Sequence, residues 1–338
     1  MKPILLYIGN KLLKHGYSAT SIETLGTLLE KENYTLYYSS SKKNKILRFL
    51  DMFFSTLYNV RKIDYVLIDT YSTNNFWYAF MVSQICRFFN KPYIPILRGG
   101  DLPNRLASSP YVSKLIFSNS LYNIAPSKYL FDVFKEHSFY KNLKLIPNTI
   151  EISNYNFHKK INIAPKILWV RSLSSIYNPK MAIDVLAKLK TDFLDAELCM
   201  VGQEKEVKII ELNQYAVSLQ VNVTFTGKLS KEEWIELSKN FDIFINTTHF
   251  DNTPVSLIEA LALGLPVVST NVGGIPYLVK DRETAILVND SDVQAMADAI
   301  IELIKNPELA QKIAANGRKL AEQFDWHIVK NQWKEILK

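Results

Sequence analysis

The stretch DNTPVSLIEALALGLPVVSTNVGG, residues 251–274, contains a helical pattern followed directly by an apolar strand, PVVST. Pro254 suits the first helical turn, where its missing N–H costs nothing, and Asn252 or Thr253 is expected to cap the helix. Gly264 is expected to end the helix, because glycine readily adopts the left-handed conformation common at helix C-termini. Another apolar strand, FDIFIN, precedes the helix, so the segment predicts a parallel strand–helix–strand unit.

The same alternation of strands and helices continues through nearly the whole chain. Apolar runs predict strands at 3–8, 34–38, 64–69, 92–97, 121–125, 143–146, 166–170, 196–201, 221–227, 241–246, 266–270 and 285–288. Helical patterns lie between them, including 21–33, 128–137, 181–190, 231–240, 292–304 and 308–324. The strands are almost continuously apolar, as expected when both faces of a parallel sheet are covered. The predicted fold class is α/β, with two doubly wound Rossmann-like domains facing across a cleft and ligands at the carboxyl ends of the strands.

Length and composition are consistent with two domains. The 338 residues are 48% hydrophobic, and the polar stretch 151–165 interrupts the alternation between a first domain, 1–155, and a second, 163–325. Cys86 and Cys199 stand in unrelated apolar segments, which disfavours a disulfide framework or a zinc site. The N-terminus is typical of a first strand rather than a signal peptide, and no apolar run is long enough to span a bilayer. A cytoplasmic location is therefore expected.

Positive charge is concentrated in the first half of the chain. Residues 1–160 contain 21 Lys and Arg against 10 Asp and Glu, whereas residues 161–338 contain 19 against 23. This asymmetry indicates an anionic partner for the first half, either a phosphate-bearing acceptor, a membrane surface or a nucleic acid; uneven decoration of two solvated surfaces is the alternative. No nucleic-acid-binding module is recognised, so nucleic acid is the least favoured partner.

Glu259 is a carboxylate in an apolar helix. It lies one turn beyond Val255 and Ser256 on the same face, at a helix start that follows a strand end, where unpaired N–H groups favour an anion. A buried carboxylate needs hydrogen-bond donors, which either the hydroxyls of a ligand or a neighbouring loop of the protein would supply. Gly273 and Gly274, after the next strand, either let the backbone approach a ligand or form a tight turn. Together these features indicate a phosphate-and-sugar site.

The segment from Asp242 to Leu287 resembles the donor-binding region of retaining glycosyltransferases of family four, which have the GT-B architecture. Two acids separated by seven residues, a Gly-x-Pro-Val-Val strand and a Gly-Gly loop match in order and spacing. Weaker matches are LIPNTIEISNYNF, NIAPSKYL, KILWVRSLSS and EQFDWHIVKNQW. The resemblance implies that the terminal helix, 326–338, packs back on the first domain, which binds the acceptor, while the second domain binds the donor.

The resemblance also implies roles for individual residues. Glu259 would accept the ribose hydroxyls of the donor, Asp251 would hold its sugar, and Arg171 would neutralise the diphosphate, so these three form the expected catalytic set. Further donor contacts are expected from Thr253, Val255, Ser256, Lys180, Gly273 and Gly274. Acceptor or phosphate contacts are expected from Gly16, Ser18, Arg98, Gly99 and Asn148. No metal site and no cofactor are implied beyond the donor substrate, which would be UDP- or GDP-linked.

Several positions depart from the family pattern. Asp251 stands where Glu is usual, and Lys180 comes later than the family lysine, so it is either a replacement or a solvated helix residue. Arg98 stands where many relatives have His, and an ion pair with Asp101 is its structural alternative. These departures leave a catalytically inactive scaffold subunit as an alternative function. A nucleotide-sugar 2-epimerase of the same architecture is a second alternative, but the several acids and the His that it would need in the first domain are not seen in the sequence.

The expected function is a hexosyltransferase-type activity that moves a sugar from a nucleotide-sugar donor to a lipid-linked or saccharide acceptor, with retention and without a metal, in polysaccharide or glycoconjugate assembly. Residues 41–62 also predict a helix that attaches peripherally to the cytoplasmic face of an anionic membrane. Its basic residues are Lys42, Lys43, Lys45 and Arg48, beside Ile46, Phe49, Leu50, Phe53 and Leu57. Covering the first sheet is the alternative role for these apolar residues.

Overall fold

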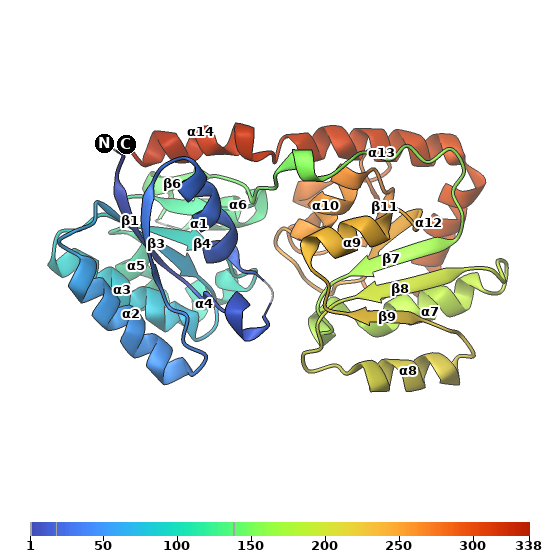
Figure 1. The fold of residues 1–338 in the computed structure, drawn as a ribbon, viewed down its shortest axis with the longest axis horizontal. Coiled ribbons are helices and arrows are strands. Elements are labelled where there is room, and N and C mark those ends of the chain that lie inside the picture. Colours follow the sequence, from blue (N-terminus) through green and yellow to red (C-terminus); the bar gives the residue numbers. More distant parts are fainter. Residues whose placement is uncertain (1, 18, 138) are drawn as a thin grey trace. The chain divides into compact units, whose positions relative to one another are not determined.

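The protein folds into two compact units, seen in a computed structural model that describes residues 2–17, 19–137 and 139–338 (Figure 1). Unit 1 comprises the chain up to Thr149 together with Trp326–Lys338, and unit 2 comprises Ile150–Asp325. The polar stretch 151–165 therefore lies within unit 2, whereas 1–155 was the expected first domain. The reason is that Ile150, Tyr155 and Ile163 are buried in the hydrophobic clusters of unit 2, which the polar residues around them conceal in the sequence.

Unit 1 is built on a six-stranded parallel sheet with the strand order β2-β1-β3-β4-β5-β6. Its strands are β1 (Ile4–Ile8), β2 (Thr35–Ser39), β3 (Tyr65–Thr70), β4 (Tyr93–Leu97), β5 (Asn123–Ala125) and β6 (Leu143–Leu145). Its helices are α1 (Ser21–Lys31), α2 (Lys45–Asn59), α3 (Asn75–Phe88), α4 (Leu102–Ser108), α5 (Pro110–Phe117), α6 (Lys128–Glu136) and α14 (Trp326–Ile336). Because the chain reverses its direction of winding between β1 and β3, the carboxyl ends of these strands form the expected ligand edge.

Helix α14 packs on unit 1. Trp326, Val329 and Trp333 are buried in the same cluster as residues of β1, α1 and β4. The helix is also joined to the end of α1 by two ion pairs, because Lys330 Nζ and Lys334 Nζ lie 3.0 and 2.7 Å from the Glu32 carboxylate. The last helix therefore completes the core of the unit that contains the start of the chain.

Helix α2 presents an apolar face to solvent at the periphery of unit 1 (Figure 1). The exposed side chains on this face are Ile46, Leu47, Leu50, Phe54, Leu57 and Tyr58. Lys42, Lys43 and Lys45 are exposed, but Arg48 is buried and does not belong to the basic cluster, which corrects the expectation from the sequence. Its guanidinium donates to the carbonyl oxygens of Lys42 and Lys43, so it stabilises the turn before the helix.

Unit 2 has a second six-stranded parallel sheet, with the order β12-β11-β10-β7-β8-β9. Its strands are β7 (Lys166–Val170), β8 (Glu197–Val201), β9 (Thr224–Gly227), β10 (Ile243–Asn246), β11 (Val267–Thr270) and β12 (Ile286–Val288). Its helices are α7 (Pro179–Leu189), α8 (Ile209–Ser218), α9 (Lys231–Ser238), α10 (Val255–Leu263), α11 (Ile275–Leu278), α12 (Val293–Lys305) and α13 (Pro307–Glu322).

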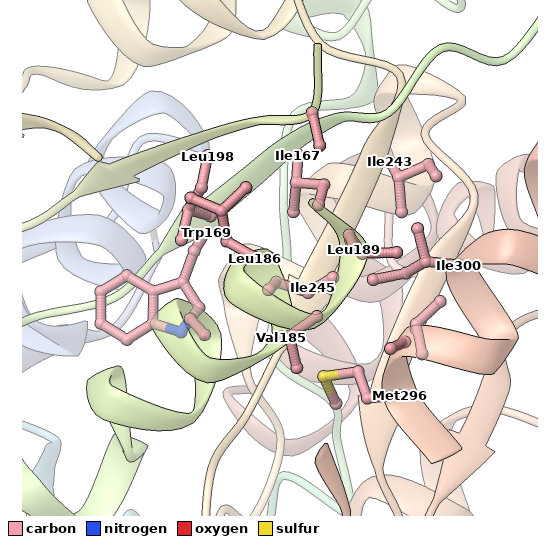
Figure 2. Close-up of a cluster of buried hydrophobic side chains, with 14 of the residues drawn as sticks. Ile167, Trp169, Val185, Leu186, Leu189, Leu198, Ile243, Ile245, Met296 and Ile300 are labelled. Atoms are coloured by element: carbon pink, nitrogen blue, oxygen red, sulfur yellow. The ribbon is translucent and has the colours of Figure 1, made fainter. Parts of the chain in front are cut away.

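The sheet of unit 2 is buried on both faces. Figure 2 shows Ile167 and Trp169 of β7 and Ile245 of β10 packed with side chains of α7 and α12. Leu168, between the first two, belongs to the opposite cluster with Leu257 of α10. Successive residues of a strand point to opposite faces, so covering both faces requires an uninterrupted apolar run. This is why KILWV could be predicted as a strand.

The predicted fold class, two doubly wound Rossmann-like domains, is confirmed, and each predicted strand overlaps an observed one. Helices α3, α4, α5, α8 and α11 were not predicted. Helices α4, α5 and α11 are short, with at most eight residues each. Across the described ranges, no helix is both long and apolar enough to cross a membrane.

Candidate functional site

Arg171 lies directly after β7, at the carboxyl edge of the sheet of unit 2. Its backbone N–H donates to Val201 O of the neighbouring strand, at 3.0 Å. Gly202 follows that strand, and a Cβ atom at this glycine would lie 1.7 Å from Arg171 O. A side chain at 202 would therefore displace the backbone that carries Arg171.

Asp251, in the loop between β10 and α10, forms an ion pair with Arg171 through Oδ2 and Nη2. The exposed fractions of the two side chains are only 14% and 13%, so water screens the pair weakly. The Arg171 guanidinium also stacks on the ring of Tyr177, 4.0 Å from its centroid. The Arg171 Nε atom is buried and has no hydrogen-bond partner in the described part of the chain. The two residues expected to bind different parts of a donor are thus paired with each other.

Gly273 and Gly274 support the loop that carries Asp251. Gly274 N–H donates to Asp251 O at 2.8 Å, and a Cβ atom at Gly274 would lie 1.9 Å from Asn252 O. Gly273 has a φ of +54°, in the left-handed region that favours glycine. Of the two roles open from the sequence, the geometry favours a turn packed against the 251–252 backbone.

Helix α10 begins at Val255, and its N-cap residue is Pro254 rather than Asn252 or Thr253, which corrects the predicted cap. Pro254 has an extended backbone, with a ψ of 115°, and lies just outside the helix. The backbone N–H groups of Val255 and Ser256 donate to no acceptor among the described residues, and Ser256 Oγ is buried without a partner there. These groups, with the buried Thr253 beside them, provide hydrogen-bond donors at a helix N-terminus, where an anion is favoured.

Glu259 is 5% exposed, and two donors of the protein reach its carboxylate. Tyr155 OH donates to Oε1 at 2.7 Å, and Lys231 Nζ lies 2.7 Å from the same oxygen. Burial raises the pKa of Tyr155, and the charge of Glu259 raises it further, so the phenol stays protonated. Neighbouring segments therefore satisfy one carboxylate oxygen, while Oε2 has no partner within the described ranges.

Lys205, which the sequence analysis missed, lies on the loop after β8 beside the Arg171 loop. Its backbone N–H donates to Leu173 O at 3.2 Å. Although burial raises the pKa of Tyr177, the charges of Arg171 and Lys205 lower it, and the net shift is downward. Lys180, by contrast, is exposed, and its Nζ lies 5.2 Å over the ring of Tyr215 in α8.

In unit 1, Arg98 lies directly after β4 and joins three segments. Its Nε lies 3.2 Å from Asp69 Oδ1 of β3, and its Nη1 donates to Asn148 Oδ1 at 2.5 Å. Tyr7 OH of β1 also donates to Asp69 Oδ1, at 3.1 Å. Arg98 therefore pairs with Asp69 rather than Asp101, which accepts from the Asn104 side chain at the start of α4. Burial raises the pKa of Asp69, and the charge of Arg98 opposes this rise.

The remaining unit 1 positions occupy turns. A Cβ atom at Gly99 would lie 2.7 Å from Ser72 N, so this glycine lets two loops at strand ends touch. Gly16 has a φ of +83° and ends the short 3₁₀ helix Leu13–His15. Ser18 lies outside the described residues. The structure thus brings Arg98 and Asn148 into contact, whereas Gly16 and Gly99 shape the backbone.

Residues 154–320 match the model of the family described as glycosyl transferases group 1. The chain is 26% identical over 171 residues to N-acetyl-alpha-D-glucosaminyl L-malate synthase of Bacillus anthracis. This match covers 50% of this chain and 44% of that protein. It is 31% identical over 150 residues to the capsular polysaccharide biosynthesis glycosyltransferase CapM of Staphylococcus aureus, and this match covers 43% of this chain and 39% of CapM. The chain thus matches less than half the length of these curated relatives.

A solved structure extends the likeness to both units. The structure of HepE from Anabaena, in complex with UDP and glucose, has a TM-score of 0.79 and covers 99% of each chain at 18% identity. At that identity the likeness shows the fold, two Rossmann-like domains of the GT-B type. With the matched family model over unit 2, the chain belongs to the glycosyl transferases group 1 family.

Proposed function

We propose that the protein transfers a sugar from a nucleotide-sugar donor to an acceptor, with retention of anomeric configuration and without a metal ion. The observation that carries the proposal is the set of groups at the carboxyl edge of unit 2: Arg171, the N–H groups of Val255 and Ser256, which have no acceptor among the described residues, and the buried carboxylate of Glu259. A cation and a helix N-terminus suit a diphosphate, and a buried carboxylate suits the hydroxyls of ribose.

In the proposed mechanism, the diphosphate contacts Arg171 and the start of α10. Negative charge grows on the leaving phosphate oxygen as the sugar departs, and a fixed guanidinium stabilises that charge without a metal. The same oxygen takes the proton of the attacking acceptor hydroxyl on the face from which the nucleotide leaves. The new glycosidic bond then forms with retention while the nucleoside diphosphate is released.

Because Arg171 and Asp251 are paired, the diphosphate is proposed to bind Arg171 before Asp251 can bind the donor sugar. A diphosphate carries more charge than a carboxylate and competes with Asp251 for the guanidinium. Asp251 is then released to accept hydrogen bonds from the hydroxyls of the donor sugar. The donor phosphate thereby frees the residue that holds the donor sugar.

Unit 1 is proposed to bind the acceptor, with Arg98 and Asn148 as contacts at the ends of its strands. The acceptor is proposed to be lipid-linked or a saccharide, and the name of the relative CapM, which refers to capsular polysaccharide biosynthesis, supports a saccharide. The HepE complex with UDP and glucose supports a UDP-linked hexose as donor. The apolar face of α2, with Lys42, Lys43 and Lys45 at its start, further supports peripheral attachment to the cytoplasmic face of an anionic membrane.

A thermal-shift screen of nucleotides and nucleotide sugars tests the donor class. A ligand at 100 times its dissociation constant adds roughly 2.7 kcal/mol of stability, which is measurable. UDP or GDP sugars are expected to stabilise the protein, and NMR of the product formed from the stabilising donor is expected to show retained configuration. Binding of nucleotide sugars without transfer to any acceptor would instead support an inactive scaffold subunit.

A further inference from the structure

We propose that Tyr155 is a positioning residue that fixes Glu259 so that its Oε2 atom faces the ribose of the donor. The inference rests on the proposed function and deepens it, because it names the group that orients the carboxylate. Tyr155 acts through Glu259 and need not touch the donor.

The first support is the way in which Tyr155 is attached to α10. Its side chain is 1% exposed, and its OH donates to Glu259 Oε1 at 2.7 Å. Its carbonyl oxygen accepts from Arg318 Nη1 at 2.6 Å, and the same Nη1 donates to Ala262 O, at 2.7 Å. The side chain of Tyr155 is thus bonded to α10 directly, and its backbone is bonded to Arg318 of α13, which in turn donates to α10.

The second support is that the two carboxylate oxygens of Glu259 differ in their contacts. Oε1 accepts from Tyr155 OH and lies 2.7 Å from Lys231 Nζ in an ion pair, whereas Oε2 has no partner within the described ranges. The Lys231 side chain is 43% exposed and has many rotamers, so its bond alone would leave the carboxylate free to rotate. A buried phenol on a fixed backbone removes this freedom, and Oε2 is then presented in one direction.

The third support is chemical. Glu259 needs donors whatever its ligand, because a buried carboxylate without them is costly. A neutral phenol supplies one without cancelling the charge that attracts ribose hydroxyls. The raised pKa of Tyr155, caused by burial and then by Glu259, keeps this phenol neutral.

The test compares UDP with 2′,3′-dideoxy-UDP by titration calorimetry. The parent protein is expected to bind UDP more tightly than 2′,3′-dideoxy-UDP, because only UDP has the ribose hydroxyls that donate hydrogen bonds to Glu259. In Tyr155→Phe, UDP affinity is expected to fall about tenfold, the scale of one lost hydrogen bond to a charged group, while dideoxy-UDP affinity stays unchanged. Tyr215→Phe is the matched control, because it removes a hydrogen bond from a phenol to the Asp184 carboxylate in the same unit. This control is expected to retain the discrimination of the parent.

Two further variants keep the test decisive. Arg318→Gln leaves the phenol in place but removes the hydrogen bonds to Tyr155 O and to Ala262 O of α10. It is expected to reduce the discrimination in the same direction, even where Tyr155→Phe folds poorly. In Glu259→Gln, adding Tyr155→Phe is expected to cause no further loss of discrimination. If the parent discriminates and both Tyr155→Phe and Arg318→Gln discriminate equally well, the positioning role is overturned. A parent that binds neither nucleotide contradicts the proposed function itself, and one that binds both equally contradicts the role of Glu259.

Discussion

Arg171 and Asp251 form an ion pair at the carboxyl edge of the unit 2 sheet, with the guanidinium stacked on Tyr177. The pair joins the loop after β7, which carries Arg171, to the loop after β10, which carries Asp251. The charged side chain after each strand is therefore neutralised by the one after the other strand. A ligand that binds one of the two side chains must therefore change the environment of its partner.

This exchange predicts opposite effects of one substitution on binding and on turnover. Asp251→Ala is expected to tighten UDP binding, because Arg171 loses its competing carboxylate, and to lower turnover by ~10²-fold or more, because the donor sugar is no longer positioned. Calorimetry and initial rates measure the two effects. Weaker UDP binding in Asp251→Ala would contradict the exchange.

Asp251→Glu tests whether the shorter acid is adapted to this site. The extra methylene extends the carboxylate by roughly 1.5 Å, a large error where hydrogen bonds need ~2.7–3.2 Å. Turnover is therefore expected to fall, with less effect on UDP binding than in Asp251→Ala. Turnover above that of the parent would show that Asp251 is a degraded residue and would favour a scaffold subunit.

Lys205 is predicted to act as a second cation at the diphosphate, together with Arg171. Lys205→Ala is expected to weaken UDP binding more than Lys180→Ala does, because the Lys205 loop pairs with the Arg171 loop whereas Lys180 lies over Tyr215. Lys180→Ala is thus the matched control for the loss of one positive charge. A larger effect at Lys180 would reverse the assignment.

The fold could be predicted because local sequence carries it. The apolar runs of β7 and β10 and the Pro254–Gly264 frame of α10 need no knowledge of distant residues. The environment of Glu259 could not be predicted, because Tyr155 is 104 residues away and stands in a polar stretch. The pairing of Arg98 with Asp69 was missed for the same reason: Asp101 is near in sequence, but Asp69 is the neighbour across the sheet. A single aromatic residue between two asparagines, in NYNF, was the available signal for Tyr155.

The ion pairs between Glu32 and α14 are expected to make the stability of unit 1 depend on acid pH. The ion pair with Lys334, followed by that with Lys330, lowers the pKa of Glu32 from 4.5 to about 2, although burial opposes the shift. A lowered pKa in the folded state means that the stabilisation is complete above pH 4.5 and is lost as the pH falls towards 2. Glu32→Gln is therefore expected to lower Tm at pH 7 and to match the parent near pH 2. Glu136→Gln, at an exposed position on α6, is the control. A Tm difference that is unchanged at pH 2 would contradict this role of the ion pairs.

Membrane attachment through α2 is tested by co-sedimentation with anionic vesicles. Changing Lys42, Lys43 and Lys45 to Glu is expected to abolish binding, since each basic residue contributes on the order of 1 kcal/mol near anionic lipid. Phe54→Ser, on the exposed apolar face, is expected to weaken it, whereas vesicles of neutral lipid should bind the parent poorly. Equal binding by the triple Glu variant would exclude this surface.

The carboxyl edge of unit 2 is proposed to bind the diphosphate and ribose of a nucleotide-sugar donor. The most direct test of this proposal is titration of UDP and GDP, with and without EDTA, into the parent, Arg171→Ala and Glu259→Gln by calorimetry. The parent is expected to bind one of these nucleotides equally well with the chelator present, and each substitution is expected to weaken this binding by about tenfold or more. Absence of binding by the parent, loss of binding in EDTA, or unchanged affinity in both variants would contradict it.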